Sequence, residues 1–376
     1  MSTSDWKNNH KESIDKKRDA ILPLSCYSIL KYQSRRESNM THLFPHTSSK
    51  IIGLALGLIL FVLSFFSSIA FGQTSISFAT VWDAFFHYDD TSTEHIIITT
   101  SRLSRAAIAM VIGASLAIAG ALLQALTGNP LASPSIFGIN AGAVFFVVVS
   151  FSLFSASSLV HYMWIAFLGA GVAAVMVYFL GSMGRGGMSP IRFVLAGAAI
   201  SALFVSLTQG LLVINQQNLE GVLFWLAGSV AGRTVDMLIP ILPFMIGGWI
   251  IAFLLAHPVN ILTSGEDIAK GLGQRTVLVK ALMISVVVVL AGGSVAVGGS
   301  IGFIGLIIPH IVRGLVGVDY RWIIPYCALL GASLLLLADV AARFIIMPQE
   351  IPIGVMTALI GTPFFIYIAR RGALKE

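Results

Sequence analysis

Long apolar runs recur along this chain between residues 51 and 369, and short polar stretches separate them. An apolar run of about 18 residues or more is long enough to cross the hydrocarbon core of a bilayer as a helix. The pattern predicts ten helices, at 51–71, 103–126, 138–156, 162–183, 192–214, 237–256, 276–297, 302–316, 322–343 and 352–369. The run at 302–316 is the shortest, so we expect that helix to be tilted, broken or enclosed by its neighbours.

Residues 1–50 form a polar tail in front of the first predicted helix. The stretch KNNHKESIDKKRDA offers few apolar side chains to bury, which predicts disorder. Met40 stands shortly before the first apolar run. The tail is therefore either a real cytoplasmic extension that starts at Met1, or a misassigned segment in front of a true start at Met40. Residues 51–372 form one predicted transmembrane domain.

Composition supports a membrane protein and excludes a soluble enzyme. The chain of 376 residues is 56% hydrophobic and only 11% charged, whereas soluble proteins carry about 25% charged residues. Cys26 and Cys327 lie too far apart in the sequence to suggest a disulfide framework or a metal site. The phosphate-binding pattern G-x-x-x-x-G-K-[ST] is missing from the sequence, so the chain is not predicted to hydrolyse ATP or to hold a cofactor.

Charge predicts the orientation in the membrane, because Lys and Arg are enriched in cytoplasmic loops. With the N-terminus inside, the predicted inner loops and C-terminal tail carry Arg185, Arg192, Lys270, Arg275, Lys280, Arg313, Arg321, Arg370, Arg371 and Lys375. The predicted outer loops carry Arg102, Arg105, Arg233 and Arg343 beside the acidic residues Asp83, Asp89, Asp90, Glu94, Glu220, Asp236 and Glu350. Both termini are therefore predicted to be cytoplasmic. The net charge of +6 reflects this bias, and no nucleic-acid partner is expected.

The turn between the second and third predicted helices is unusual. Its sequence, LTGNPLASPSIFGINAGA at 126–143, holds two prolines and no charged residue. Pro130 and Pro134 each fix a backbone φ angle and prevent the helix from continuing. Such a turn is suited to an uncharged constriction on a transport pathway, and a tight buried turn without any gating role is the alternative.

A weak internal repeat agrees with the number of helices. GASLAIAG at 113–120 and GGSVAVGG at 292–299 share the pattern Gly-x-Ser-apolar-Ala-apolar-x-Gly. The two segments lie five predicted spans apart, so they cross the membrane in opposite senses. Inverted repeats of this kind are common in transporters, although Gly and Ala also recur by chance in apolar helices.

Three arginines on the predicted outer side run against the usual charge bias. Arg102 and Arg105 lie three residues apart and share a helix face, and Arg343 ends the ninth predicted helix. They are suited to docking an acidic partner, or they reach lipid phosphates at the interface. Asp339 lies one turn before Arg343, so it either pairs with that arginine or orients it for docking.

The predicted inner loop at 260–278 is long enough for a short helix. We expect it near 265–272, capped by Ser264 and ended by Gly271 or Gly273. A cytoplasmic amphipathic helix can insert into a groove of a partner, or it is an ordinary connection. Elsewhere, a lone polar group within the spans is costly, so bonds between helices are expected for Gln124, Gln209, His310 and Arg313.

Several long motifs occur together in this chain. In order, they are RLSRAAIAMVIGASLAIAGALLQALTGNPLASPSIFGINAGA, SGEDIAKGLG, GFIGLIIPHIVR and LLLADVAARFIIMPQEIPIGVMTALIGTPFFIYIARR. They resemble the iron-siderophore and vitamin B12 (FecCD-type) permeases of ABC importers, from about residue 50 to residue 372. The resemblance implies the type II ABC importer permease fold of ten helices, in the bacterial cytoplasmic (inner) membrane.

The resemblance also implies partners. The permease pairs with a second copy or a second permease, two ATPase subunits lie beneath it, and an extracytoplasmic binding protein delivers the cargo. By position, Arg102, Arg105 and Arg343 match arginines that dock the binding protein. Asn129 and Leu131 match a cytoplasmic gate, to which Ser189 is a looser addition. The ATPase-coupling segment is matched by Gly265, Glu266, Ala269, Leu272 and Gly273.

The cargo implied by the resemblance is a ferric siderophore, with cobalamin or haem as the alternative. An ion-coupled secondary transporter is a different class that also has many helices. Such a transporter usually places carboxylates near the middle of the membrane, and the predicted spans hold few of them.

Overall fold

A computed structural model describes residues 43–72, 76–153, 159–183, 190–214, 226–347 and 349–373. Within these residues the regular structure is helical. In the described part of the chain, seven helices are long and apolar enough to cross a membrane, and three shorter apolar helices accompany them. Each of the ten predicted spans corresponds to one of these helices, which confirms the predicted all-α membrane class.

The seven long and three shorter apolar helices follow the predicted order. They are α3 (Thr47–Ala70), α6 (Leu103–Thr127), α7 (Ile139–Leu153), α8 (Leu159–Ser182), α9 (Pro190–Ile214), α12 (Leu242–Thr263), α14 (Thr276–Gly298), α15 (Ile304–Val316), α16 (Tyr320–Phe344) and α17 (Ile353–Ala373). Short helices lie between them: α4 (Phe78–Phe86), α5 (Thr93–Ile96), a π-helical turn (Ile97–Arg102), a 3-10 turn (Pro134–Phe137), α11 (Val235–Leu238) and α13 (Glu266–Gly271).

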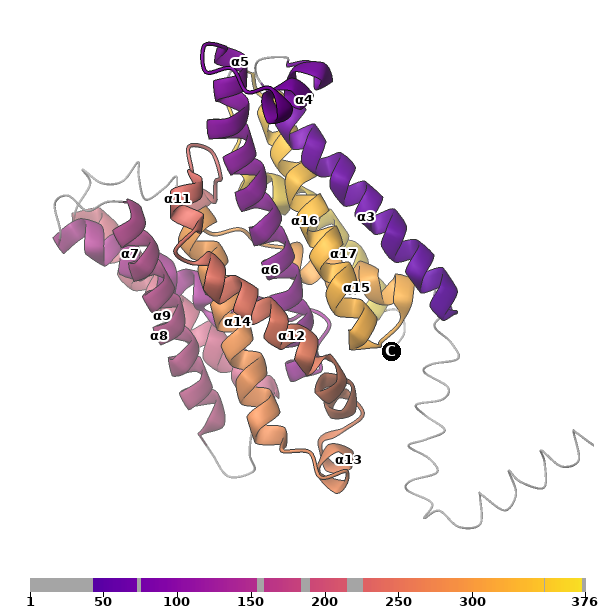
Figure 1. Cartoon of the computed structure of the whole chain (residues 1–376). Helices are drawn as coiled ribbons and strands as arrows, with labels where there is room; N and C mark the ends of the chain where they lie inside the picture. Colours follow the sequence, from indigo (N-terminus) through magenta and orange to yellow (C-terminus); the bar gives the residue numbers. More distant parts are fainter. Residues whose placement is uncertain are drawn as a thin grey trace, which may run out of the picture.

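The two ends of the helix bundle differ (Figure 1). One end, here called the α5 end, carries α4, α5 and the start of α6. The other, here called the α13 end, carries the short helix α13. Successive spanning helices run in opposite directions, so α3 begins and α17 ends on the α13 side. The start of α3 and the end of α17 therefore lie at the same end of the bundle.

Helix α6 is the centre of the bundle. In its most apolar 18-residue stretch, 89% is buried, and it packs against α14, α15 and α16. Two of its glycines allow neighbouring backbones to come very close: Gly113 faces Gly331 of α16, and Gly120 faces Gly305 of α15. Glycine at a helix crossing permits this approach because it has no side chain. The two segments of the predicted repeat lie in α6 and α14, and their relation as a repeat stays a prediction.

Helix α15 is short because it is enclosed. It has only 13 residues, and most of its length is buried. Its N-cap residue Phe303 has a φ of 67°, which is uncommon for a residue other than glycine. A Cβ atom at Gly361 of α17 would lie 2.3 Å from the Phe303 ring, so Gly361 makes room for that ring. This packing holds the start of α15 against α17.

The predicted sixth helix was placed too early. A separate short helix, α11, occupies Val235–Leu238, and α12 runs from Leu242 to Thr263 rather than ending at 256. Pro258 lies inside α12, where sequence reasoning expects a helix to end. The helix continues because Val259 and Leu262 extend its buried face beyond the proline. The free energy gained by burying these side chains outweighs the cost of the backbone hydrogen bond that Pro258 removes.

The bundle begins before residue 51. The backbone N–H of Leu43 and that of Phe44 donate to the carbonyls of Gly314 and Leu315, at 3.3 and 2.9 Å. Those carbonyls belong to the last turn of α15, where the carbonyl groups have no hydrogen-bond partners within the helix. Residues 43–50 are thus part of the packed domain. The rest of the predicted tail, with Met1 and Met40, lies outside the described residues.

Candidate functional sites at the two ends of the bundle

Two of the predicted docking arginines hold the end of α3. Arg102 Nη1 donates to the carbonyls of Ile69 and Ala70, at 2.8 and 2.6 Å. Arg343 Nη1 donates to the carbonyls of Ser68 and Phe71, both at 2.8 Å. The last carbonyls of a helix lack partners within it, and cations are favourable there. Arg102 and Arg343 are only 5% and 3% exposed, and their docking role stays a prediction.

A buried carboxylate connects two of these arginines. Asp339 is completely buried and accepts hydrogen bonds from Arg343 and from Arg105, the latter at 2.8 Å from both Nε and Nη2. The predicted pairing of Asp339 with Arg343 is confirmed, and Asp339 also orients Arg105. Arg105 Nη1 contacts Glu350 Oε2 at 2.6 Å. We call Arg102, Arg105, Arg343, Asp339 and Glu350 the arginine cluster.

The arginine cluster has one accessible edge, at the α5 end of the bundle. The side chains of Arg105 and Glu350 are 12% and 25% exposed, whereas Asp339 is closed off from solvent. The cluster contains three positive and two negative groups, so it keeps a net positive charge. Sequence reasoning missed the pairing of Glu350 with Arg105, because a contact across 245 positions of sequence has no local pattern.

At the α13 side of α6, the uncharged turn folds back on itself. Gly128 ends α6 with a φ of 62°, a conformation that glycine adopts without strain. The side-chain oxygen of Asn129 accepts a hydrogen bond from the backbone N–H of Leu131 at 2.9 Å. The Asn129 carbonyl accepts another from Ala132 N–H at 3.1 Å. Asn129 and Leu131 are both half-buried, and Ser189, the third predicted gate residue, lies outside the described residues.

Gln124 ties this turn to a neighbouring helix. Its side-chain Nε2 donates to the carbonyl of Ala132 in the turn at 3.2 Å and to that of Gly305 in α15 at 3.1 Å. The predicted inter-helix role of Gln124 is confirmed. Gln209, by contrast, is exposed on α9, and the His310 ring packs against Phe364 of α17. Because Gln124 bonds to both the turn and α15, a movement of α15 would be transmitted directly to the turn.

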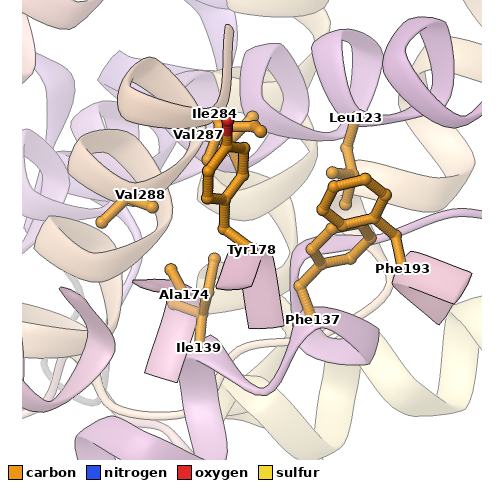
Figure 2. A pocket seen from close by; sticks show the side chains of 9 residues that line it. All are labelled: Leu123, Phe137, Ile139, Ala174, Tyr178, Phe193, Ile284, Val287 and Val288. Carbon is orange, nitrogen blue, oxygen red and sulfur yellow. The ribbon is translucent and has the colours of Figure 1, made fainter. Parts of the chain in front are cut away.

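A small cavity beside the turn is apolar, as Figure 2 shows. Its lining consists of Leu123, Phe137, Ile139, Ala174, Tyr178, Phe193, Ile284, Val287 and Val288. A site that recognises a polar ligand needs several convergent polar groups, and Tyr178 carries the one side-chain hydroxyl in this lining. The cavity is a packing gap between helices and not a recognition site for a charged ligand.

At the α13 end, Glu266 anchors the predicted coupling helix to the bundle. Glu266 Oε2 contacts Lys280 Nζ of α14 at 2.5 Å, and Oε1 contacts Lys270 Nζ at 3.1 Å. Hydrogen bonds from these two lysines lower the pKa of Glu266 below its usual value. The carboxylate therefore stays ionised at neutral pH. Lys280 is mostly buried, so Glu266 fastens α13 to a fixed point on α14.

Helix α13 has an inward and an outward face. Ala269 is fully buried, whereas Ile268 and Leu272 are 44% and 70% exposed. Gly265 precedes the helix with a φ of 127° and Gly273 follows it with a φ of 78°, so both ends need glycine. The N-cap is Gly265 and not the predicted Ser264. The result is a short, firmly held helix that presents two bulky apolar side chains outward.

Comparisons with known proteins agree with these features. A family model described as "FecCD transport family" matches residues 59–371. The chain is 53% identical over 326 residues to the "Probable siderophore transport system permease protein YfiZ" of Bacillus subtilis (strain 168), covering 87% of this chain and 98% of that protein. It is 45% identical to the "Iron(3+)-hydroxamate import system permease protein FhuB" of the same organism, covering 86% of this chain and 84% of that protein.

The fold has a counterpart among solved structures. An inward-facing structure of a metal-chelate type ABC transporter superimposes with a TM-score of 0.75 and 30% identity, covering 85% of this chain and 98% of that chain. Sequence and fold thus agree with these proteins over 85–87% of this chain. This polypeptide belongs to the FecCD transport family.

Proposed function

We propose that this chain is the membrane-spanning permease subunit of a binding-protein-dependent ABC importer that carries a ferric siderophore into the cell. The observation that carries the proposal is the match to a siderophore permease over 98% of that protein's length. The sequence has no phosphate-binding loop, so ATP hydrolysis belongs to a separate subunit. The α13 end faces the cytoplasm, and the α5 end faces outward.

The competing transporter class is less well supported. A secondary transporter usually keeps an ionisable carboxylate available for a coupling ion. Within the described spanning helices, Asp339 is a buried carboxylate, but two arginines already engage it. An ion would have to displace an arginine to bind there.

Uptake by living cells tests the cargo. A strain that lacks this chain should fail to accumulate radiolabelled iron from a ferric hydroxamate, and a plasmid copy of the gene should restore uptake. Labelled cobalamin and haem serve as parallel cargoes in the same strain. Loss of cobalamin or haem uptake with iron uptake intact would replace the proposed cargo, and normal uptake of all three would contradict the importer function.

The outward face of α13 is proposed as the docking point for the ATPase subunit, with Gly265, Glu266, Ala269, Leu272 and Gly273 shaping it. Ala269 and Glu266 hold the helix to the bundle, while Ile268 and Leu272 protrude. Exposed bulky apolar side chains in an aqueous region mark a protein interaction site. Because the helix is fastened to α14, a movement of the ATPase would pass into the spanning helices.

Leu272→Arg should weaken assembly with the ATPase. A buried charge in place of an apolar anchor typically reduces affinity by about tenfold or more. Co-purification of the ATPase with the tagged permease in detergent measures the effect. Leu43→Arg is the matched control, because Leu43 is 69% exposed, also on the α13 side of the bundle, and outside α13. Equal loss of the ATPase from both variants would contradict docking at α13.

The arginine cluster is proposed as the docking surface for the substrate-binding protein, with Arg105 as its accessible residue. The net positive charge of the cluster is complementary to an acidic partner. Arg102 and Arg343 stabilise this surface, because they hold the end of α3 in place.

The half-buried turn with Asn129 and Leu131, together with Ser189, is proposed as the cytoplasmic gate between two permease subunits, either identical or different.

A further inference from the structure

We propose that Glu350 occupies the position of the partner's carboxylate on Arg105 and is displaced when the binding protein docks. This inference rests on the proposed docking function of the arginine cluster. It adds a regulatory element to that function: the docking surface is closed by the chain's own acidic side chain until the partner arrives.

Arg105 is already bound by two carboxylates of its own chain. Its Nε and Nη2 contact the Asp339 carboxylate, and its Nη1 contacts Glu350 at 2.6 Å. A guanidinium offers two edges on which a carboxylate can bind with good geometry. One edge is used by Asp339 and the remaining side by Glu350. A partner carboxylate that approaches Nη1 of Arg105 therefore competes with Glu350.

Of the two carboxylates, Glu350 is the one that can be replaced. Asp339 is fully buried and also binds Arg343, so its removal would leave charges uncompensated. The side chain of Glu350 is 25% exposed, next to Arg105. Ion pairs near solvent contribute little and exchange easily with competing charges. A carboxylate from outside therefore meets a weakly held competitor at the accessible edge of the cluster.

The position of Glu350 connects docking to the start of α17. Ile351 N–H donates to the carbonyl of Ala342 in α16 at 3.2 Å, and Gly354 N–H donates to the carbonyl of Gly228 at 3.0 Å. Through its contact with Arg105 of α6, Glu350 adds a third attachment, in the connection between α16 and α17. Its displacement removes the side-chain attachment between the connection and α6, and leaves the two backbone bonds in place.

The test compares four permease variants in lipid nanodiscs. The probe is the substrate-binding protein that co-purifies with the unmodified permease, and the measurement is its dissociation constant. Glu350→Gln keeps the side-chain shape and removes the competing charge, so this variant should bind the partner about two- to fivefold more tightly, as expected for a partly exposed ion pair. Asp90→Asn is the matched control: it removes one charge from an exposed residue of the α4–α5 connection, and should bind as the unmodified chain does.

The remaining two variants separate this inference from the proposed function. Arg105→Gln should weaken binding, and adding Glu350→Gln to it should give no gain, because the competitor acts through Arg105. Unchanged binding by Arg105→Gln would overturn the docking proposal itself. Weaker binding by Arg105→Gln with no gain from Glu350→Gln would overturn only the displacement. An equal gain in affinity from Asp90→Asn, or a gain that persists without Arg105, would also overturn the displacement. The tighter binding would then come from removing any negative charge.

Discussion

Asp339→Asn should destabilise the protein more than any other single charge removal in the arginine cluster. Asp339 is completely buried between Arg105 and Arg343. Removing one partner of a buried ion pair leaves the other charge uncompensated, at a cost of about 3–5 kcal/mol. Thermal unfolding of the purified protein in detergent should show a clearly lower midpoint, and the amount of folded protein in the membrane should fall.

Glu350→Gln is the matched control for this prediction. It removes one negative charge from the same cluster, but the side chain of Glu350 is partly exposed. A partly exposed pair contributes about 1 kcal/mol or less, so its unfolding midpoint should stay close to that of the unmodified protein. Equal shifts for the two variants would show that burial of Asp339 does not govern the stability of the cluster.

Gly120→Ala should separate α6 from α15. A Cβ atom at Gly120 would lie 2.0 Å from the carbonyl oxygen of Gly305, which is backbone and cannot rotate away. Overpacking of this kind costs about 1–3 kcal/mol. Because Gln124 also ties the turn after α6 to Gly305, we expect transport to fall together with thermal stability.

Gly247→Ala provides the comparison for Gly120→Ala. Gly247 lies inside the spanning helix α12, and a Cβ atom there would meet no neighbouring atom within 4 Å. Alanine is preferred over glycine in a helix interior, so this variant should be neutral or slightly stabilised. Similar losses in both variants would indicate a general effect of helix glycines and would contradict the close approach of α6 and α15.

The arginine cluster was predictable from the sequence only in part. The charge pattern of the loops predicted an outer position for Arg102, Arg105 and Arg343, and helical spacing predicted the pairing of Asp339 with Arg343. Their burial was not predictable, because the carbonyls that Arg343 holds belong to α3, 272 and 275 positions earlier. No local pattern records which helix end a long side chain reaches. The same reason hid Glu350 as the second partner of Arg105.

The amino-acid sequence by itself determined the ten apolar helices of the described residues, their order and the family. Hydrocarbon cannot satisfy backbone hydrogen bonds, so each apolar run of membrane length must form a helix. That constraint is local, and it can be read along the chain. Only the tertiary structure decided that α12 continues through Pro258, that Gly120 meets Gly305, and that Arg102 and Arg343 cap α3. These features depend on which helices become neighbours, and that choice depends on packing among segments far apart in the sequence.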